Sequence, residues 1–297
     1  MIRWLCFVVV LMLTVSGCSQ GTKSELSKSA GDVAANVQSA DNPDALDAAG
    51  KEQPQAVNSE ENAMDKSFAV DTFGYQMDEF DTKSGKKIAF HCIKHGSIRI
   101  QYDGLEFEID PVIKLNDRTT DYASFPDADY ILVTHEHFDH LDAEAIKALE
   151  KAGTTLITNQ SCASKLGRGD VMANGDVRDL RDDIKLEAVP AYNTTPEHTQ
   201  FHPKGRDNGF VLTLDGFRIY IAGDTEDIPE MAEIHDIDVA FLPCNQPYTM
   251  TVQQLVNASA RIKPKVLFPY HYGETSMDDV MAAMKNSTID LRIRNYQ

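Results

Sequence analysis

The sequence is poor in basic residues and in cysteine, and it has no serine-nucleophile motif beyond residue 21. Its 297 residues include 28 Lys and Arg against 46 Asp and Glu, a net charge of −18, which argues against a nucleic-acid partner because phosphates require a basic surface. No Gly-x-Ser-x-Gly elbow is predicted, because the one match, at residues 17–21, does not lie between a predicted strand and a predicted helix. Cys92, Cys162 and Cys244 lack Cys-x-x-Cys spacing, and we expect them to be buried small apolar side chains. Hydrophobic residues at 42% and charged residues at 25% are nevertheless typical of a globular protein.

The N-terminus carries an apolar run over residues 4–15, interrupted by Thr14. About twelve residues are too few to span a bilayer core of ~30 Å, but they suit the core of a signal peptide. The following Val15-Ser16-Gly17-Cys18 resembles the lipobox of bacterial lipoproteins. This resemblance implies a signal peptide at 1–17, lipidation at Cys18 and anchoring to a membrane of the bacterial cell envelope (the periplasmic side of the outer membrane in a Gram-negative host). A short transmembrane anchor ending in Gly-Cys is the alternative.

No aromatic residue occurs between residues 19 and 66, where small and polar residues dominate. Such a stretch buries too little apolar area to offset its ordering entropy, so 18–66 is predicted to be a disordered tether. Aromatic residues return at Phe68, Phe73 and Tyr75. We therefore expect one catalytic domain over 67–297, in which 37 acidic residues still outnumber 23 basic ones.

The domain is predicted to mix strands and helices in an α/β (α+β) fold. Asp103-Gly104 and Asp215-Gly216 each separate two apolar runs and predict hairpins. Thr251 and Gln254 fit a capping box. The predicted strands are 87–93, 97–102, 105–109, 130–133, 155–157, 185–189, 210–214, 217–221, 239–242 and 266–270, and the predicted helices are 142–152, 252–262 and 278–284.

A dense group of metal-binding side chains directly follows the predicted strand 130–133, in Thr134-His135-Glu136-His137-Phe138-Asp139-His140. Imidazole and carboxylate groups suit zinc and similar divalent metals. His135 and His137 are two residues apart, so on an extended chain they point to the same side. Asp139 and His140 are adjacent and diverge, so they can serve a second ion. The pattern predicts a metal centre.

This segment resembles the His-x-His-x-Asp-His signature of the metallo-β-lactamase fold, and the resemblance extends over residues 90–291. It implies a four-layer αββα sandwich. Gly223-Asp224-Thr225 and His271 match the later ligand positions of the family. One branch, which contains L-ascorbate-6-phosphate lactonase and many uncharacterised zinc-dependent hydrolases, is similar in His95-Gly96-Ser97, Asp110-Pro111 and His202-Pro203-Lys204-Gly205.

The resemblance also implies roles for individual residues. His135 and His137 would bind the first metal, whereas Asp139, His140 and His271 would bind the second. Asp224 would bridge both metals. The family's third histidine ligand to the first metal is missing, because Tyr192-Asn193 stands where it is expected. His202 is the favoured replacement, with His198, Asn193 or a one-metal site as alternatives.

Five other residues are candidates for contact with substrate or for a structural role. His95 is a candidate for lining the site or hydrogen-bonding a ligand. Lys204, together with Arg206, forms a small cationic spot that could meet an anionic group. His91, on a predicted strand, is expected to be a core side chain, and His235 to be exposed.

The function implied is that of a metal-dependent, dinuclear zinc hydrolase, with manganese or iron as alternative metals. A metal-bound hydroxide would attack an ester, lactone, amide or phosphodiester bond, and Asp139 or a metal-bound water would protonate the leaving group. The substrate would be a small molecule, anionic or lipid-derived. The rival functions are a mononuclear-iron oxygenase on the same fold and a non-enzymatic envelope lipoprotein that binds metal or ligand.

Overall fold

The computed structural model describes residues 68–296. The predicted signal peptide (1–17), the lipidation site Cys18 and the predicted tether (18–66) lie outside the described residues. Within the described part of the chain, no helix is long and apolar enough to cross a membrane. Cys92, Cys162 and Cys244 are buried free thiols, as predicted.

The first sheet has eight strands in the order β1-β2-β3-β4-β5-β8-β9-β10. Pairing is antiparallel from β1 to β5 and parallel from β5 through β8 and β9 to β10. Asp103 and Gly104 both have positive φ and close the predicted hairpin between β4 and β5. The strands are β1 Ala69–Val70, β2 Gln76–Asp81, β3 Lys87–Lys94, β4 Ser97–Tyr102, β5 Leu105–Ile109, β8 Ala128–Val133, β9 Glu150–Thr158 and β10 Asp170–Val171.

The second sheet has seven strands in the order β11 to β17. Its first four strands are antiparallel and include the predicted hairpin at Asp215-Gly216, whereas β14 to β17 are parallel. The strands are β11 Val177–Arg181, β12 Ile184–Ala191, β13 Asp207–Leu214, β14 Phe217–Ile221, β15 Val239–Pro243, β16 Val266–Tyr270 and β17 Asp290–Leu291. A separate short ribbon pairs β6 Lys114–Leu115 with β7 Arg118–Thr119.

The helices are α1 Ala143–Leu149, α2 Gln160–Leu166, α3 Val252–Ile262 and α4 Met277–Met284, with the short 3₁₀ helices η1 Tyr122–Ser124 and η2 Pro229–Glu233. The predicted capping box of Thr251 and Gln254 is confirmed at the start of α3. The prediction of a helix over 142–152 was wrong at its end, because the chain enters β9 at Glu150 and pairs there with Ala128. The apolar spacing continues past Leu149, but sheet pairing overrides it.

Among the elements of five or more residues, β2, β11, α2 and η2 were not predicted. β2 reads Gln-Met-Asp-Glu-Phe-Asp, whose acidic composition hides its strand character. α2 is only seven residues long and buries only Cys162. It is defined by its ends, where the Asn159 side chain accepts from the Cys162 N–H and Gly167 adopts a left-handed conformation.

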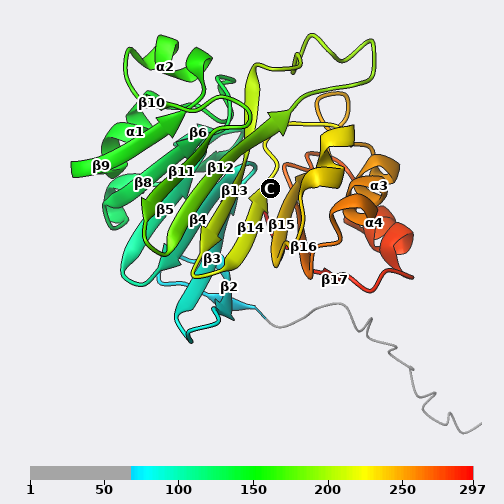
Figure 1. Cartoon of the computed structure of the whole chain (residues 1–297), viewed down its shortest axis with the longest axis horizontal. Coiled ribbons are helices and arrows are strands. Elements are labelled where there is room, and N and C mark those ends of the chain that lie inside the picture. Colours follow the sequence, from blue (N-terminus) through cyan, green and yellow to red (C-terminus); the bar gives the residue numbers. More distant parts are fainter. Residues whose placement is uncertain (1–67, 297) are drawn as a thin grey trace, which may run out of the picture. The chain divides into compact units, whose positions relative to one another are not determined.

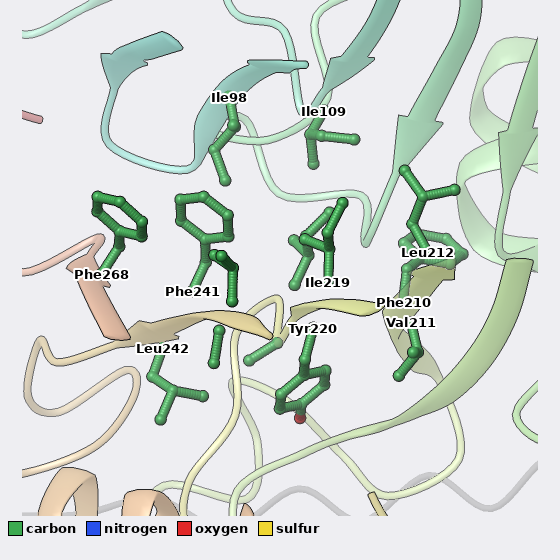
Figure 2. Packing of buried hydrophobic residues seen from close by; sticks show 14 of the residues in the cluster. Ile98, Ile109, Phe210, Val211, Leu212, Ile219, Tyr220, Phe241, Leu242 and Phe268 are labelled. Carbon is green, nitrogen blue, oxygen red and sulfur yellow. The ribbon is translucent and has the colours of Figure 1, made fainter. Parts of the chain in front are cut away.

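The two sheets pack face to face and helices cover their outer faces (Figure 1). In Figure 2, Ile98 and Ile109 of the first sheet lie opposite Phe241 and Ile219 of the second. A separate apolar cluster packs α1 against the outer face of the first sheet, and α3 and α4 contribute buried residues beside the second. The predicted αββα sandwich is therefore confirmed.

Candidate metal centre

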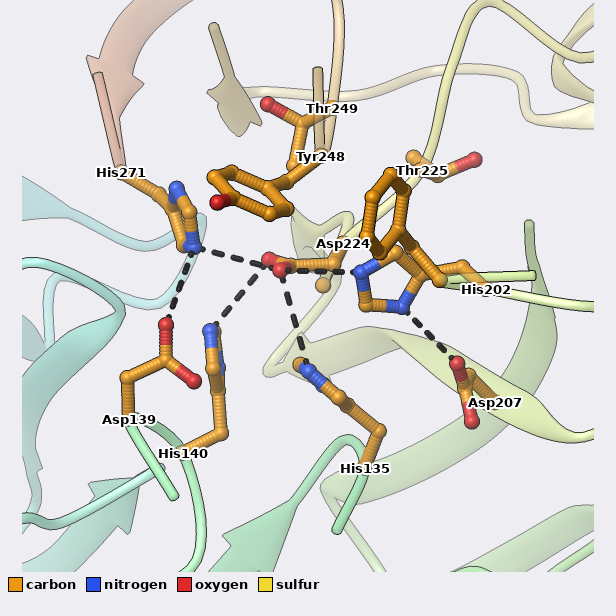
Figure 3. A network of polar contacts seen from close by, with 12 residues as sticks. His135, Asp139, His140, His202, Asp207, Asp224, Thr225, Tyr248, Thr249 and His271 are labelled. Carbon is orange, nitrogen blue, oxygen red and sulfur yellow. Dashed lines mark hydrogen bonds and ion pairs between the residues drawn. The ribbon is translucent and has the colours of Figure 1, made fainter. Parts of the chain in front are cut away.

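The candidate ligands lie in loops that follow strand ends. Residues 134–140 follow β8, Asp224 lies just after β14, and His271 directly follows β16. His95 occupies the turn between β3 and β4, and His202 lies in the long loop between β12 and β13. Figure 3 shows six of the ligand side chains converging from these separate elements.

The first ligand group consists of His135, His137, His202 and Asp224, whose ligand atoms all lie within 4.8 Å of one another. His135 Nε2 is 3.7 Å and His202 Nε2 is 3.4 Å from Asp224 Oδ2. Three of the four side chains are buried, and His137 is partly exposed. The first sheet supplies two members of this group and the second sheet supplies the other two.

The second ligand group consists of His95, Asp139, His140 and His271, again with ligand atoms within 4.8 Å of one another. His95 Nε2 lies 3.0 Å from Asp139 Oδ2. Asp224 also reaches this group, because its Oδ1 lies 3.3 Å from His140 Nε2 and its Oδ2 lies 3.2 Å from His271 Nε2. The Asp224 carboxylate thus lies between the two groups, and each group draws on both sheets.

The ring nitrogens of the buried histidines fit metal ions. The Nε2 atoms of His135, His140, His202 and His271 are all buried and make no hydrogen bond. Burying an unsatisfied polar atom is costly, and here four of them point at one carboxylate. A divalent cation would coordinate the imidazole nitrogens and the carboxylate oxygens together.

Buried carboxylates hold the opposite side of two of these rings. Asp110 Oδ2 lies 2.8 Å from His140 Nδ1, and Asp207 Oδ2 lies 3.0 Å from His202 Nδ1. Both carboxylates are fully buried. An Nδ1–H that donates to a carboxylate leaves Nε2 unprotonated and available to a metal, which is how proteins orient histidine ligands.

The backbone around the second group is tightly constrained. A Cβ atom at Gly96 would lie 2.6 Å from His140 Cε1, so only glycine leaves room for that ring. His95, Asp110 and His271 all adopt positive φ, between 44° and 49°. Non-glycine residues rarely adopt this conformation, and they do so mainly at functional sites, where packing enforces it.

The pKa values of the ligand histidines differ between the two groups. Burial by itself lowers the pKa of His140, but Asp224 and Asp110 outweigh it and raise the pKa to about 9. The pKa of His271 is likewise lowered by burial and raised more strongly by Asp224 and Asp139, to about 10. Burial and the nearby positive charge of His140 lower the pKa of His135 well below its ordinary value. The acidic ligands therefore hold protons on the second group when no metal is bound.

Asp139, predicted as both ligand and proton donor, is held as a carboxylate. Burial raises its pKa, but the nearby His271 and the hydrogen bond with His95 lower it far more, to well below the ordinary range. Its Oδ2 is 3.7 Å from His271 Nε2. This charge state suits a metal ligand, whereas donation to a leaving group requires Asp139 to take up a proton first.

Other candidates lie outside both groups. The His198 Nδ1 lies 3.2 Å from Glu226 Oε1, and Asn193 donates its amide N–H to the carbonyls of His198 and Tyr248. Among His202, His198 and Asn193, the structure brings only His202 into the first group. Asn193 and His198 instead tie down the loop that carries His202.

Lys204 and Arg206, the predicted cationic spot, both form ion pairs within the protein. Lys204 Nζ lies 2.7 Å from Glu230 Oε1 and over the Tyr192 ring. Arg206 pairs with Asp207 and with Glu136. His91 is buried between Asp71 and Gln101, and His235 is exposed, so both behave as predicted.

A pocket of about 510 Å³ opens over the two ligand groups. Its lining includes three aromatic residues that the sequence did not indicate: Phe138, Phe201 and Tyr248. Lys165 and Asn245 also line it. The sequence signal for Phe138 is its place inside the histidine motif. Phe201 and Tyr248 reach the pocket through loop packing, which the sequence does not show.

Two packed sheets with histidine and carboxylate ligands at their strand ends are typical of the metallo-β-lactamase fold. Comparison with known proteins supports this assignment. Residues 89–271, more than half of the chain, match the family described as the Beta-lactamase superfamily domain, so the chain belongs to that superfamily. A "UPF0173 metal-dependent hydrolase" of Archaeoglobus fulgidus is 31% identical over 201 residues, which cover 62% of this chain and 86% of that protein. Its counterpart in Ligilactobacillus salivarius is 33% identical over 195 residues, covering 63% and 84%. The chain is thus a member of the UPF0173 family of metal-dependent hydrolases.

Solved structures show the same fold. A Parabacteroides distasonis protein, provisionally described as a metal-dependent hydrolase, is 53% identical with a TM-score of 0.72, covering 75% of this chain and all of that one (100%). Igni18, a metallo hydrolase from Ignicoccus hospitalis, is 23% identical with a TM-score of 0.60 over 70% and 95%. CmlA, a diiron β-hydroxylase from Streptomyces venezuelae, is 13% identical with a TM-score of 0.57 over 70% and 53%. The last two establish a shared fold only.

Proposed function

We propose that the protein is a dinuclear, zinc-dependent hydrolase that cleaves an ester, lactone, amide or phosphodiester bond of a small molecule. The observation that carries the proposal is the set of four buried imidazole Nε2 atoms without hydrogen bonds that converge on Asp224. Two ligand groups that share one carboxylate are what a pair of neighbouring ions requires.

The residues divide into two binding sets. One ion would be held by His135, His137 and His202 of the first group. The other would be held by the second group, His95, Asp139, His140 and His271. Asp224 would be shared by both ions. Ions held in this way supply a water of lowered pKa and polarise the substrate's oxygen.

The rest of the chemistry belongs to the chain itself. Asp110 and Asp207 hold the ligand rings in one tautomer, which keeps the ligand geometry in place before substrate arrives. Asp139 lies at the pocket surface, 19% exposed, and is the ligand-group carboxylate placed to exchange a proton with substrate. No cysteine lines the pocket among the described residues, which agrees with a reaction that needs no protein nucleophile.

Two substitutions and a metal measurement test the proposal. Asp224→Ala or His135→Ala should abolish zinc-dependent turnover on a panel of esters, lactones and phosphodiesters, while the circular dichroism spectrum stays that of a folded protein. His235→Ala, an exposed histidine away from the site, is the matched control and should remain active. Full activity of Asp224→Ala would overturn the proposal.

Metal analysis of the purified protein separates the rival chemistries. About two equivalents of zinc or manganese support hydrolysis. One equivalent of iron, with oxygen-dependent turnover, supports the oxygenase alternative, and metal without turnover on any substrate supports a binding protein. The shared fold of the diiron β-hydroxylase CmlA is the reason to make this measurement first.

We also propose that the domain is tethered to a membrane of the bacterial cell envelope through lipid at Cys18. The support is the apolar run over residues 4–15 and the Val15-Ser16-Gly17-Cys18 sequence after it. Feeding an alkyne-tagged fatty acid to a bacterial host should label the full chain, and Cys18→Ser should remain unlabelled. Equal labelling of both chains would contradict the proposal.

A further inference from the structure

The pocket above the metal ligands has an apolar wall built from three separate loops. Phe138 lies between two ligands of the histidine motif and is 77% exposed. Phe201 immediately precedes His202, and Tyr248, 45% exposed, follows β15. The Phe201 and Tyr248 rings pack against each other edge to face with centroids 5.1 Å apart.

The loops that carry two of these rings are fixed in place. Asn193 donates to the carbonyl of Tyr248 at 2.8 Å and to that of His198 at 3.2 Å. Glu226, fully buried, accepts from the backbone N–H groups of Thr194 and Thr195. A wall held by buried hydrogen bonds is preorganised, so its rings need little ordering when a ligand binds.

The polar part of the lining carries a single cation, the exposed Lys165. Apart from the candidate metal ligands, its charged residues are Glu136 and Lys165, one of each sign, and Lys165 Nζ already donates to the Glu136 carbonyl. Lys204 and Arg206, the predicted anion-binding residues, are not part of the lining and are paired with carboxylates. The part of the substrate away from the reacting bond therefore meets three rings and two charged groups of opposite sign, so the lining has no net charge outside the ligand groups.

Resting on the proposed hydrolase function, we propose that the substrate carries an apolar acyl group that packs against Phe138, Phe201 and Tyr248 while its scissile bond lies over Asp224. A pocket of about 510 Å³ has the size of small-molecule sites, which bind apolar surface on rings and orient the ligand with a few polar groups. Phe138 is the determinant of this preference, because its largely exposed ring can bury more area than any other residue of the wall.

The test measures binding separately from turnover. Straight-chain carboxylates from acetate to octanoate, which mimic the acyl product, are titrated into the zinc-loaded full chain by calorimetry. Affinity should rise about threefold for each added methylene that reaches the wall. Inorganic phosphate, the probe for an anionic substrate, should bind no more tightly than acetate.

Phe138→Ala should lower the ratio of octanoate to acetate affinity about tenfold, and Phe138→Leu should restore most of it, because the contact is apolar rather than specifically aromatic. Val177→Ala removes another exposed apolar side chain, 53% exposed and outside the pocket, and should keep the wild-type ratio. Zinc content is measured for every variant, so a lost ion is not mistaken for a lost contact.

Equal affinity for acetate and octanoate in the wild type, or an unchanged ratio in Phe138→Ala, would overturn the acyl proposal. An ester panel of the same chain lengths separates this from the parent proposal. Zinc-dependent turnover that is independent of chain length overturns only the acyl preference. Chain-length-dependent binding with no turnover of any substrate supports the acyl site and overturns the hydrolase.

Discussion

The fully buried Asp110 should control the second metal site without touching the metal. Its Oδ1 accepts from the Thr134 N–H at 2.8 Å, and its Oδ2 accepts from the Thr134 hydroxyl at 2.7 Å and from His140 Nδ1 at 2.8 Å. In Asp110→Asn, the amide oxygen would keep the Thr134 N–H bond and the amide N–H group would face His140. His140 Nδ1 must then accept, so its proton moves to Nε2, the atom that points at Asp224.

A protonated Nε2 cannot bind a metal, so the second ion should bind about 10- to 100-fold more weakly, a free-energy change of about 1.4–2.8 kcal/mol. Unfolding should become easier by about 1–3 kcal/mol, because a buried hydrogen-bond network is rearranged. Zinc titration in competition with a chelator measures both sites in one experiment. The first group is the internal reference, since Asp207 holds His202 independently of Asp110.

Asp71→Asn is the matched control for this prediction. It alters another buried aspartate–histidine pair, Asp71 with His91, at 2.6 Å and outside both ligand groups. This variant should lose stability but retain both zinc affinities. If Asp110→Asn bound two zinc ions as tightly as the wild type, the assignment of His140 as a tautomer-controlled ligand would be wrong.

Three further predictions concern the same centre. In Gly96→Ala, the new Cβ would lie 2.6 Å from His140 Cε1, so the variant should purify with about one metal equivalent less; wild-type metal content would refute the steric argument. Because the pKa values of His140 and His271 are raised above 7 in the metal-free chain, zinc must displace their protons, and affinity should fall as the pH is lowered. Calorimetry in buffers of different ionisation enthalpy should detect this proton release, and heats independent of buffer would contradict it. Zinc at 100 times its Kd should stabilise the fold by about 2.7 kcal/mol, so a chelator should lower the Tm. An unchanged Tm would mean that zinc does not bind preferentially to the folded chain.

Features encoded within a few neighbouring residues were predictable from the sequence. The histidine motif follows an apolar strand, and its ligands are close in sequence, so the short segment after β8 is enough to bring His135 and His137 together. Both Asp-Gly hairpins and the Thr251 capping box depend on adjacent residues and were predicted correctly. The sandwich followed from the family resemblance rather than from any local pattern.

Features that depend on loop packing were not predictable. His202 was correctly favoured, but the buried Asp207 that holds its ring was not recognised from the sequence. Lys204 looked like a free cation because Glu230, its partner, is distant in sequence. The end of α1 was misplaced because pairing of Glu150 with Ala128 depends on a neighbouring strand. For Lys204 and for the end of α1, the deciding partner is remote in sequence.

The division of each ligand group between the two sheets has a consequence for folding. His135 and His140 come from the first sheet, whereas His202 and His271 come from the second, and Asp224 joins them. Neither sheet alone presents a complete site, so the chain cannot bind an ion tightly until the sandwich has closed. Contacts so remote in sequence form slowly, and metal capture should therefore be among the last steps of folding. Once captured, each ion acts as a cross-link between the sheets, so the rate of sandwich opening should set how fast the protein loses its metal.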